Sequence, residues 1–311
     1  MKIEEISDNE YLSLFGPYCH PYNSVQYNSL YKRKCEKTIC LLFYENRTKI
    51  GLIAGIKEST LSSPFSAPFG GFTANGHLVK LNELNDAVIL LENYSKQNLI
   101  NNIKFILPPS IYDENLISKT HYSLTLNGYT LLTDINYHFQ TANFARYKED
   151  VIEKKARQNL NKAIDFGLIF KQVFSNSEKS IAYDIIKSNK DSKGRPTCLR
   201  FDDIIEVSNI IPIDFFLVFT KDHPIASAIV YRVSKNIVHV IYWGDLSESN
   251  LYRPMNFLSY KLFEFYSNQR IEIIDLATAS TGGIPNFGLC NFKENIGCTA
   301  TLKFTISKSI L

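Results

Sequence analysis

Residues 214–245, DFFLVFTKDHPIASAIVYRVSKNIVHVIYWGD, decide the fold that the sequence predicts. Three apolar runs rich in β-branched and aromatic residues are separated by the turn-like segments KDHP and SKN. This pattern is typical of three consecutive antiparallel strands. The next segment, PMNFLSYKLFEFYSNQ, predicts a helix, because its leading residue Pro254 suits a first helical turn. Two further apolar runs, IEIIDLAT and TATLKFTIS, predict strands on either side of residues 286–298.

Helical periodicity comes before these strands. Four apolar residues recur at every fourth position and predict one helix face: Ile152, Ala156, Leu160 and Ile164. Gly167 stands where a helix C-cap belongs, and the following LIFKQVF predicts a strand. Two more helical segments are expected near 178–190 and 202–209.

The first half of the chain shows a similar order of elements. The runs TICLLFYE and IGLIAGIKE, joined by NRTK, predict a β-hairpin. Leu84, Val88 and Leu91 recur at helical spacing, which predicts a helix. NIKFILPP predicts a buried strand that its two prolines end, and TLLTDINYHFQTA predicts another strand.

Strands that cluster in hairpins before each helix favour an α+β fold over a doubly wound sheet. A chain of 311 residues is long enough for two domains of ordinary size. We therefore expect two similar domains, 1–147 and 148–311, each a mixed, mostly antiparallel sheet flanked by helices.

The composition, with 45% hydrophobic and 21% charged residues, is that of a globular protein with ample core. A net charge of +3 does not by itself indicate binding to DNA. No apolar run approaches the roughly 20 residues that span a bilayer. The opening residues, MKIEEISDNEY, are acidic and polar, which argues against a secretory signal and favours the cytoplasm.

Six cysteines are scattered without a C-x-x-C pair: Cys19, Cys35, Cys40, Cys198, Cys290 and Cys298. Most lie in or beside apolar stretches, so we interpret them as small buried residues in a reducing compartment. The histidines do not cluster with them at ligand spacing, so no metal site is expected.

Residues 286–298, NFGLCNFKENIGC, place a Phe-Lys pair between two glycines shortly before the last strand. The residues alone leave two interpretations open. The segment is a loop or short helix that exposes Lys293 to solvent, or it holds a catalytic cation in a cleft. Spacing alone favours the solvated lysine. No nucleophile elbow, P-loop or HExxH motif offers another catalytic site.

Seven segments, in their order along the chain, carry a resemblance to a known family: SSPFSAPFGGF, ARQNLNKAIDFGL, PIASAIVYR, VIYWGD, RPMNFLSYKLFEF, IIDLATAS and NFGLCNFKENIG. In these segments the chain resembles FemAB/FemX-like (FemABX) proteins of the GNAT, or acyl-CoA N-acyltransferase, superfamily. The resemblance covers most of the chain and is strongest over residues 145–300. Its most diagnostic piece is the Phe-Lys followed by glycine. In that family two GNAT-like domains are fused and transfer an acyl or aminoacyl group.

The resemblance implies that Phe292 and Lys293 belong to a catalytic site. A lysine there would stabilise the oxyanion that develops when an amine attacks an acyl carbonyl. One oxyanion-hole donor contributes roughly 2.7–4 kcal/mol to such a transition state. The aromatic neighbour would hold and shield the cation.

The resemblance also concerns the strand Val238–Trp243. In acyltransferases of this fold that strand splays from its neighbour, here the strand with Asp275, and offers main-chain N–H groups to the acyl carbonyl. Tyr242 and Trp243 would supply them, and a plain core role for both is the alternative. Asp245 and Asp275 are candidate bases, or else turn caps and polar anchors.

For the donor, the resemblance implies acyl-CoA, such as acetyl-CoA, or else aminoacyl-tRNA. Many acyl-CoA enzymes hold the pyrophosphate in a glycine-rich loop, whereas DLSESNLYRPMN contains no glycine. Asn250, Arg253 and the first main-chain N–H groups of the next helix are the candidates for donor binding. The absence of a long coiled-coil insertion and of a basic face disfavours tRNA, because Lys154 to Lys162 suits a solvated helix side.

The first domain is expected to form the wall for the acceptor. Gly70 and Gly71 lie where the backbone must pass close to a ligand or to the facing domain. Arg157 and Arg195 are candidates for gripping an acidic or phosphorylated acceptor, because a guanidinium pairs well with phosphate. Solvated arginines are the alternative.

Together these observations predict an intracellular transferase that moves an acyl or aminoacyl group onto an amine. The acceptor would be an amino sugar or a cell-wall or surface-polysaccharide precursor, a small molecule or nucleotide-sugar held between the domains. Such a protein would act in cell-envelope biogenesis. Two alternatives are a non-catalytic ligand-binding protein on a degenerate GNAT fold and a tRNA-dependent aminoacyl transferase.

Overall fold

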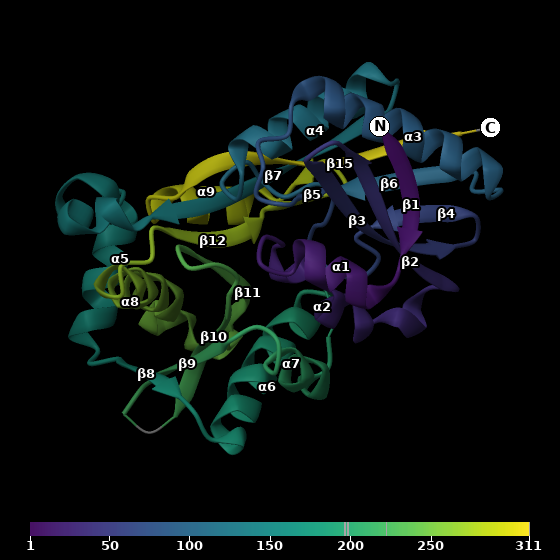
Figure 1. The fold of residues 1–311 in the computed structure, drawn as a ribbon. Helices are drawn as coiled ribbons and strands as arrows, with labels where there is room; N and C mark the ends of the chain where they lie inside the picture. Colours follow the sequence, from purple (N-terminus) through teal and green to yellow (C-terminus); the bar gives the residue numbers. More distant parts are fainter. Residues whose placement is uncertain (196, 198, 222, 311) are drawn as a thin grey trace. The chain divides into compact units, whose positions relative to one another are not determined.

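The computed structural model describes residues 1–195, 197, 199–221 and 223–310, and the chain divides into two compact units (Figure 1). The first unit holds Met1–Ile135, Ser280–Ile284 and Thr301–Leu311. The second holds Asn136–Ala279 and Pro285–Ala300. Compactness thus places residues 136–147 in the second unit and most of the last strand in the first. The predicted domains 1–147 and 148–311, with their separate roles, stay a prediction.

The first unit is a mixed sheet with the strand order β1-β2-β3-β4-β6-β15, in which β5 pairs with β3. Its strands are β1 (Lys2–Ile6), β2 (Lys37–Glu45), β3 (Thr48–Lys57), β4 (Thr60–Ser63), β5 (Thr73–Ala74), β6 (Asn102–Ile106) and β15 (Thr299–Ser309). Its helices are α1 (Asp8–Phe15), α2 (Val25–Ser29), α3 (Leu81–Gln97) and α4 (Glu114–Leu126), with the 3₁₀ turns η1 (Pro21–Asn23) and η2 (Lys32–Lys34). The short strands β13 (Ser280–Thr281) and β14 (Ile284–Pro285) form a separate ribbon.

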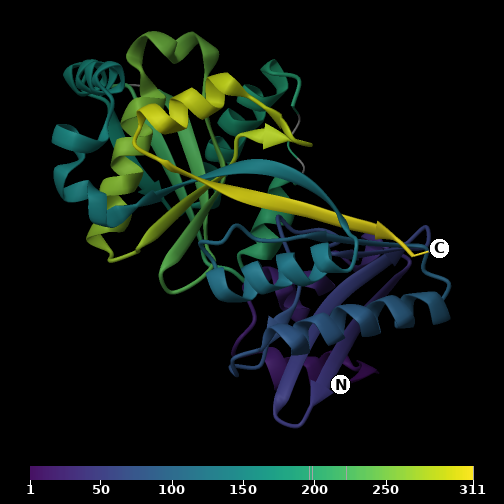
Figure 2. The same cartoon turned by 90° about the horizontal axis from the view of Figure 1, so that it is seen from above.

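The hairpin predicted in the first half is confirmed. β2 and β3 pair antiparallel from Lys37↔Ile56 to Glu45↔Thr48. The helix predicted from the spacing of Leu84, Val88 and Leu91 is also confirmed, because all three side chains are fully buried on one face of α3. α3 and α4 lie side by side (Figure 2).

The second unit is a mixed sheet with the strand order β7-β12-β11-β10-β9-β8. Its strands are β7 (Thr130–Gln140), which begins in the first unit, β8 (Ile169–Val173), β9 (Ile213–Phe219), β10 (Pro224–Arg232), β11 (Ile237–Asp245) and β12 (Ile273–Thr278). Its helices are α5 (Lys154–Asp165), α6 (Asn176–Ser192), α7 (Phe201–Val207), α8 (Pro254–Asn268) and α9 (Phe287–Asn295), with the helical turns η3 (Thr141–Arg146), η4 (Tyr147–Val151) and η5 (Ser247–Tyr252).

Residues 214–245 form the predicted meander β9-β10-β11. Helices cover both faces of it (Figure 1). The hydroxyl of Ser227 on β10 donates to the carbonyl of Ala182 on α6. Its neighbours Ala226 and Ala228 belong to the core that contains Phe263 of α8. Since successive side chains of a strand point to opposite faces, α6 and α8 lie on opposite faces of the sheet.

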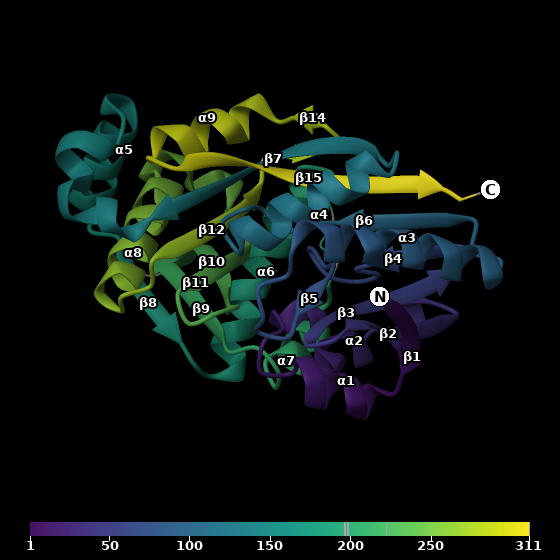
Figure 3. The ribbon, with the colours of Figure 1, turned by 45° about the horizontal axis from the view of Figure 1, so that its top comes forward.

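Helix α5 lies against α8 (Figure 3). Its predicted apolar face is correct at Ala156 and Leu160, which are buried. It is wrong at Ile164, which is 40% exposed, while Ala163 is buried in its place. Ile152 is buried but precedes the helix. The error arises because each step of four residues turns about 40° past a full turn of a 3.6-residue helix, so the row leaves the contact.

Among the described cysteines, Cys40 and Cys290 are buried and three are half-buried: Cys19, Cys35 and Cys298. Cys198 lies outside the described residues. In the part of the chain that the structure describes, no three His, Cys, Asp or Glu side chains are grouped to hold a metal ion. None of the described helices is both long enough and apolar enough to pass through a membrane.

Gly297 follows α9 and fixes how that helix ends. It has a φ of 84°, and a Cβ at this position would lie 2.4 Å from Cγ1 of Val151. Gly167 has a similar φ of 70°, but no atom lies within 4 Å of its would-be Cβ. The two glycines therefore separate backbone strain from steric contact.

We predict that Gly167→Ala lowers the free energy of unfolding by about 1–2 kcal/mol through its left-handed backbone alone. Gly297→Ala is expected to lower the free energy of unfolding by a further ~1–3 kcal/mol, because Val151 must move. Urea unfolding of both variants measures the difference. Equal losses would show that the contact between Gly297 and Val151 does not constrain the end of α9.

Candidate active site

The strands β11 and β12 run parallel and then separate. Their register stops at His239↔Asp275, although β11 continues to Asp245 and β12 to Thr278. In the first unit, the parallel pair β4–β6 runs through Ser63, the last residue of β4. The splay that the family resemblance implies for this strand is therefore present in the second unit.

A β-bulge in β11 lies within the splay. Val240 and Tyr242 pair with consecutive residues of β10, so Ile241 between them has no partner in either ladder. A bulge reverses the alternation of the side chains that follow it. Trp243 consequently packs against the same core as Val240. Tyr242 faces α6, where Nζ of Lys190 lies 4.7 Å from its ring centroid.

The facing strand β12 is also irregular. Its register with β7 shifts between Asp275 and Thr278, and Ala277 has a left-handed φ of 61°. This conformation costs a non-glycine residue roughly 1–2 kcal/mol, so it requires supporting contacts. The carboxylate of Asp275 accepts hydrogen bonds from the N–H of Ala277 at 2.9 Å and from Nδ2 of Asn136 at 2.8 Å.

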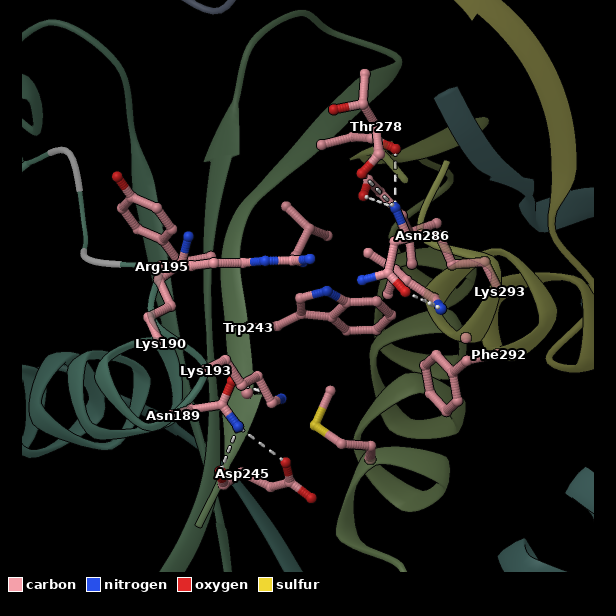
Figure 4. A pocket seen from close by; sticks show the side chains of 18 of the residues that line it. Asn189, Lys190, Lys193, Arg195, Trp243, Asp245, Thr278, Asn286, Phe292 and Lys293 are labelled. Atoms are coloured by element: carbon pink, nitrogen blue, oxygen red, sulfur yellow. Dashed lines mark hydrogen bonds between the residues drawn. The ribbon is translucent and has the colours of Figure 1, made fainter. Parts of the chain in front are cut away.

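Residues 286–298 contain the helix α9. Lys293 lies on this helix and is only 1% exposed. The interpretation of this segment as a loop or short helix that exposes Lys293 to solvent is therefore wrong about the lysine, although the short helix is present. The Lys293 ammonium donates to three consecutive carbonyl oxygens of β12, as Figure 4 shows: Leu276 at 2.8 Å, Ala277 at 2.9 Å and Thr278 at 3.1 Å. An ammonium has three donors, and these carbonyls accept from all of them.

The charge state of Lys293 follows from its surroundings. Desolvation by burial lowers the pKa of Lys293 to about 8, against charge interactions with Cys298 and Asp275 that raise it. Three carbonyl acceptors favour the protonated form. The ring of Tyr137 lies 5.6 Å from Nζ and adds a cation–π contact. Lys293 is thus a buried cation at neutral pH.

A cavity of about 530 Å³ opens where the two strands separate, within the second unit (Figure 4). Its walls come from the end of α6, from β11, α8, β12 and α9. Because α6 and α8 cover opposite faces of the sheet, the cavity extends through the splay. The rings of Trp243 and Phe292 meet edge to face in its wall, with centroids 5.8 Å apart.

Three cations line one side of this cavity: Lys190, Lys193 and Arg195. Asp245 is the single carboxylate among the described lining residues. Burial raises the pKa of Asp245, and the positive charge of Lys193 opposes this. Asn189 links the two, because it donates to the main-chain and side-chain oxygens of Asp245 and accepts from Nζ of Lys193 at 3.0 Å.

The cavity brings together six of the residues predicted from the sequence: Tyr242, Trp243, Asp245, Phe292, Lys293 and Arg195. Figure 4 shows Arg195 pointing into it from the segment that follows α6, and Trp243 from β11. Their predicted catalytic, donor-binding and acceptor-binding roles stay predictions.

The structure does not bring the other six to the cavity, among them Asp275, which is buried in β12. Asn250 and Arg253 are exposed at η5 and at the start of α8. The guanidinium of Arg157 donates to the carbonyl of Lys148. Gly70 and Gly71 lie in the first unit, where a Cβ on Gly70 would meet Pro64 at 2.7 Å and where the N–H of Gly71 donates to Ser63. The backbone that Gly70 approaches thus belongs to its own unit.

Sequence reasoning missed four elements of this site. Asn189, Lys190 and Lys193 lie on successive turns near the end of α6, and the stretch NKDSK gives no motif beyond its charge. The bulge at Ile241 leaves no signal at all, because Ile241 continues an ordinary apolar run.

No family model and no curated protein matches this sequence. Several solved structures share its fold. The chain is similar to FemX, with a TM-score of 0.66, 10% identity and coverage of 98% of this chain and 97% of that one. It is also similar to the C-terminal domain of a putative lysylphosphatidylglycerol synthetase from Agrobacterium fabrum, with a TM-score of 0.59, 11% identity and coverage of 97% and 92%.

A third similar structure is a tandem GNAT protein from the clavulanic acid biosynthesis pathway. Its TM-score is 0.58 at 8% identity, with coverage of 100% of this chain and 98% of that one. At such identities the likeness concerns the fold. The chain therefore has the predicted α+β fold of two tandem GNAT-like domains, and the resemblance to FemX is confirmed at the level of the fold.

The cationic wall of the cavity predicts how strongly charged solutes quench the fluorescence of Trp243. Trp243 is the only tryptophan of the chain, so its fluorescence reports on this site alone. Iodide should quench it more strongly than caesium at equal ionic strength, because the nearby cations concentrate anions. The double variant Lys193→Gln, Arg195→Gln should lower the iodide quenching constant at least about twofold. Acrylamide quenching should stay unchanged. Equal quenching of the natural protein by iodide and caesium would contradict a cationic cavity.

Proposed function

We propose that this chain is an acyl or aminoacyl transferase whose acyl group binds in the cavity between β11 and β12. The observation that carries the proposal is the splay of two parallel strands with an unpaired bulge residue, Ile241, in the wall of a cavity of about 530 Å³. The fold shared with FemX and with a tandem GNAT protein supports the same reaction class.

In this proposal the main chain of β11 holds the acyl carbonyl. A bulge leaves one residue outside the ladder, and main-chain N–H groups aimed at a developing oxyanion are effective in a site that excludes water. Tyr242 and Trp243 follow the bulge and continue the same wall. The positive charge of Lys293 acts from the opposite strand through space, since its three donors are engaged with β12.

The acceptor is an amine that also carries an anionic group. Lys193 and Arg195 supply positive charge at the rim, and a guanidinium suits a phosphate or carboxylate. Asp245 lines the same cavity, and in this proposal it takes the proton that the attacking amine loses. This set fits an amino sugar, a nucleotide-sugar or another small precursor of the cell wall or of a surface polysaccharide, which agrees with a role in cell-envelope biogenesis.

The start of α8 does not fit the pyrophosphate of an acyl-CoA donor. Pro254 has no N–H, and the N–H groups of Asn256 and Phe257 donate to the carbonyl of Arg253. Donors at the start of this helix are therefore largely used. Whether the donor is an acyl-CoA or an aminoacyl-tRNA, this feature indicates that it does not bind through a phosphate at the start of α8.

The same feature favours the second candidate function, a binding protein that keeps the fold without transfer. A thermal-shift screen distinguishes the two. Acetyl-CoA, longer acyl-CoAs, aminoacyl-tRNA and nucleotide-sugars are tested one by one. Stabilisation by a donor, followed by transfer of its labelled acyl group to an amino sugar, supports the transferase. Stabilisation by nucleotide-sugars alone, with no transfer from any donor, would replace it with the binding protein.

Asp245 gives this proposal a pH signature. A general base must be deprotonated, so transfer should fall as the pH falls through the pKa of Asp245, which burial raises above its ordinary value of 3.8. Asp245→Asn should lower kcat by about 10²–10⁴-fold and abolish that acid limb. Asp191→Asn, on the exposed side of α6, is the matched control. An acid limb that survives in Asp245→Asn would assign the base elsewhere.

A further inference from the structure

We infer that Lys293 is a positioning residue: its buried ammonium holds β12 in a bent path and so sets the width of the cavity between β11 and β12. The inference concerns the cavity of the proposed function and gives Lys293 a role there other than direct contact with the acyl group. Its geometric content stands apart from whether the protein transfers anything.

The peptide groups around Ala277 carry the argument. The N–H of Ala277 donates to Asp275, and its C=O accepts from Lys293, so one charged side chain holds each side of this residue. Ala277 is held in a left-handed conformation that an alanine rarely adopts. Such a conformation persists only where surrounding contacts impose it. Asp275 and Lys293 are the contacts that impose it here.

The place of this bend explains its effect. The register of β11 and β12 ends at His239↔Asp275, directly before the three carbonyls that Lys293 holds. Successive carbonyls of a regular strand point to alternate sides, so three in a row reach one ammonium only where the strand bends. The ammonium therefore favours the bent path of β12 over a path in register with β11. This bend keeps the two strands apart at the cavity.

Direct donation from Lys293 to a substrate oxygen is disfavoured by the same contacts. Each of its three donors already has an acceptor between 2.8 and 3.1 Å away. Transfer of one donor to a ligand would leave a buried carbonyl without a partner, which costs about 1–3 kcal/mol. The lysine therefore shapes the wall, while donors to the acyl group come from the opposite strand.

Titratable groups of β12, of α9 and the residues after it, and of β7 lie near Lys293. Asp275 of β12 and Cys298, which follows α9, interact with its charge, as does Cys290 of α9. Burial raises the pKa of Cys298 far above neutrality. On β7, burial and a hydrogen bond to Glu294 raise the pKa of Tyr137 likewise. Cys290 is the neighbour on the same helix as Lys293, so its substitution serves as a control for that of Lys293.

Deprotonation of Lys293 leaves two N–H donors for three carbonyls. Since burial lowers the pKa of Lys293 to about 8, the wall should loosen as the pH rises through that value. Trp243 reports this change, because its indole contacts Phe292, the residue next to Lys293 on α9. A transition in the emission of Trp243 is expected between about pH 7 and 9.5.

The experiment records the emission and acrylamide quenching of Trp243 in the natural protein and in four variants. In Lys293→Met, both quantities at pH 7 should match those of the natural protein at high pH, and the transition should vanish. Lys293→Arg keeps the charge, so its emission should stay constant across the range. Cys290→Ala and Lys190→Met, a lysine-to-methionine change on the other wall, should both keep the transition.

A second site tests the link to the backbone. Glycine adopts the left-handed conformation without strain, so Ala277→Gly should restore to Lys293→Met at least about half of its lost free energy of unfolding. If Lys293→Met alone folds poorly, the inference is tested by whether adding Ala277→Gly restores folding. A flat titration of the natural protein, or the same transition in Lys293→Met, would overturn the inference. Neither outcome depends on turnover, so a failure of the proposed transferase activity would be seen separately, in the transfer assay.

Discussion

Three consecutive carbonyl oxygens of one strand accept hydrogen bonds from a single buried ammonium, and the candidate site depends on this contact. Burying a charge is unfavourable unless hydrogen bonds and an opposite charge compensate it. Lys293 has both, with the carbonyls of β12 on one side and the charge of Asp275 nearby. The same two side chains hold Ala277 in a strained conformation. The strain at Ala277, the buried charge of Lys293 and the separation of β11 from β12 therefore depend on the same contacts.

Two irregularities on facing strands make the cavity. The bulge at Ile241 turns Trp243 towards the core side of the sheet and Tyr242 towards α6. The bend at Ala277 carries β12 away from β11. Regular strands would have closed their ladder and filled the space with paired backbone. Local departures from regular geometry are thus where this fold acquires a place for a ligand.

The two units show why the fold alone does not define the site. Both contain an antiparallel meander followed by a parallel pair, β4–β6 in the first and β11–β12 in the second. The first pair stays in register to the end of its shorter strand, whereas the second separates beside a cavity. Likeness to FemX and to a tandem GNAT structure covers both halves. Only the residues in the splay distinguish the half that contains the cavity.

The sequence by itself determined the elements of this protein: the meander over 214–245, the hairpin β2–β3, the apolar face of α3 and the α+β class. These depend on local periodicity and turn residues, which are written in the order of the chain. It also singled out Lys293, through family resemblance. Only the tertiary structure decided what surrounds that lysine. Burial, the three carbonyl acceptors and the wall from α6 join residues up to 104 positions apart (Asn189 to Lys293), and the bulge at Ile241 has no mark in the sequence. Contacts at such separations arise when strands and helices pack, and no local pattern records them.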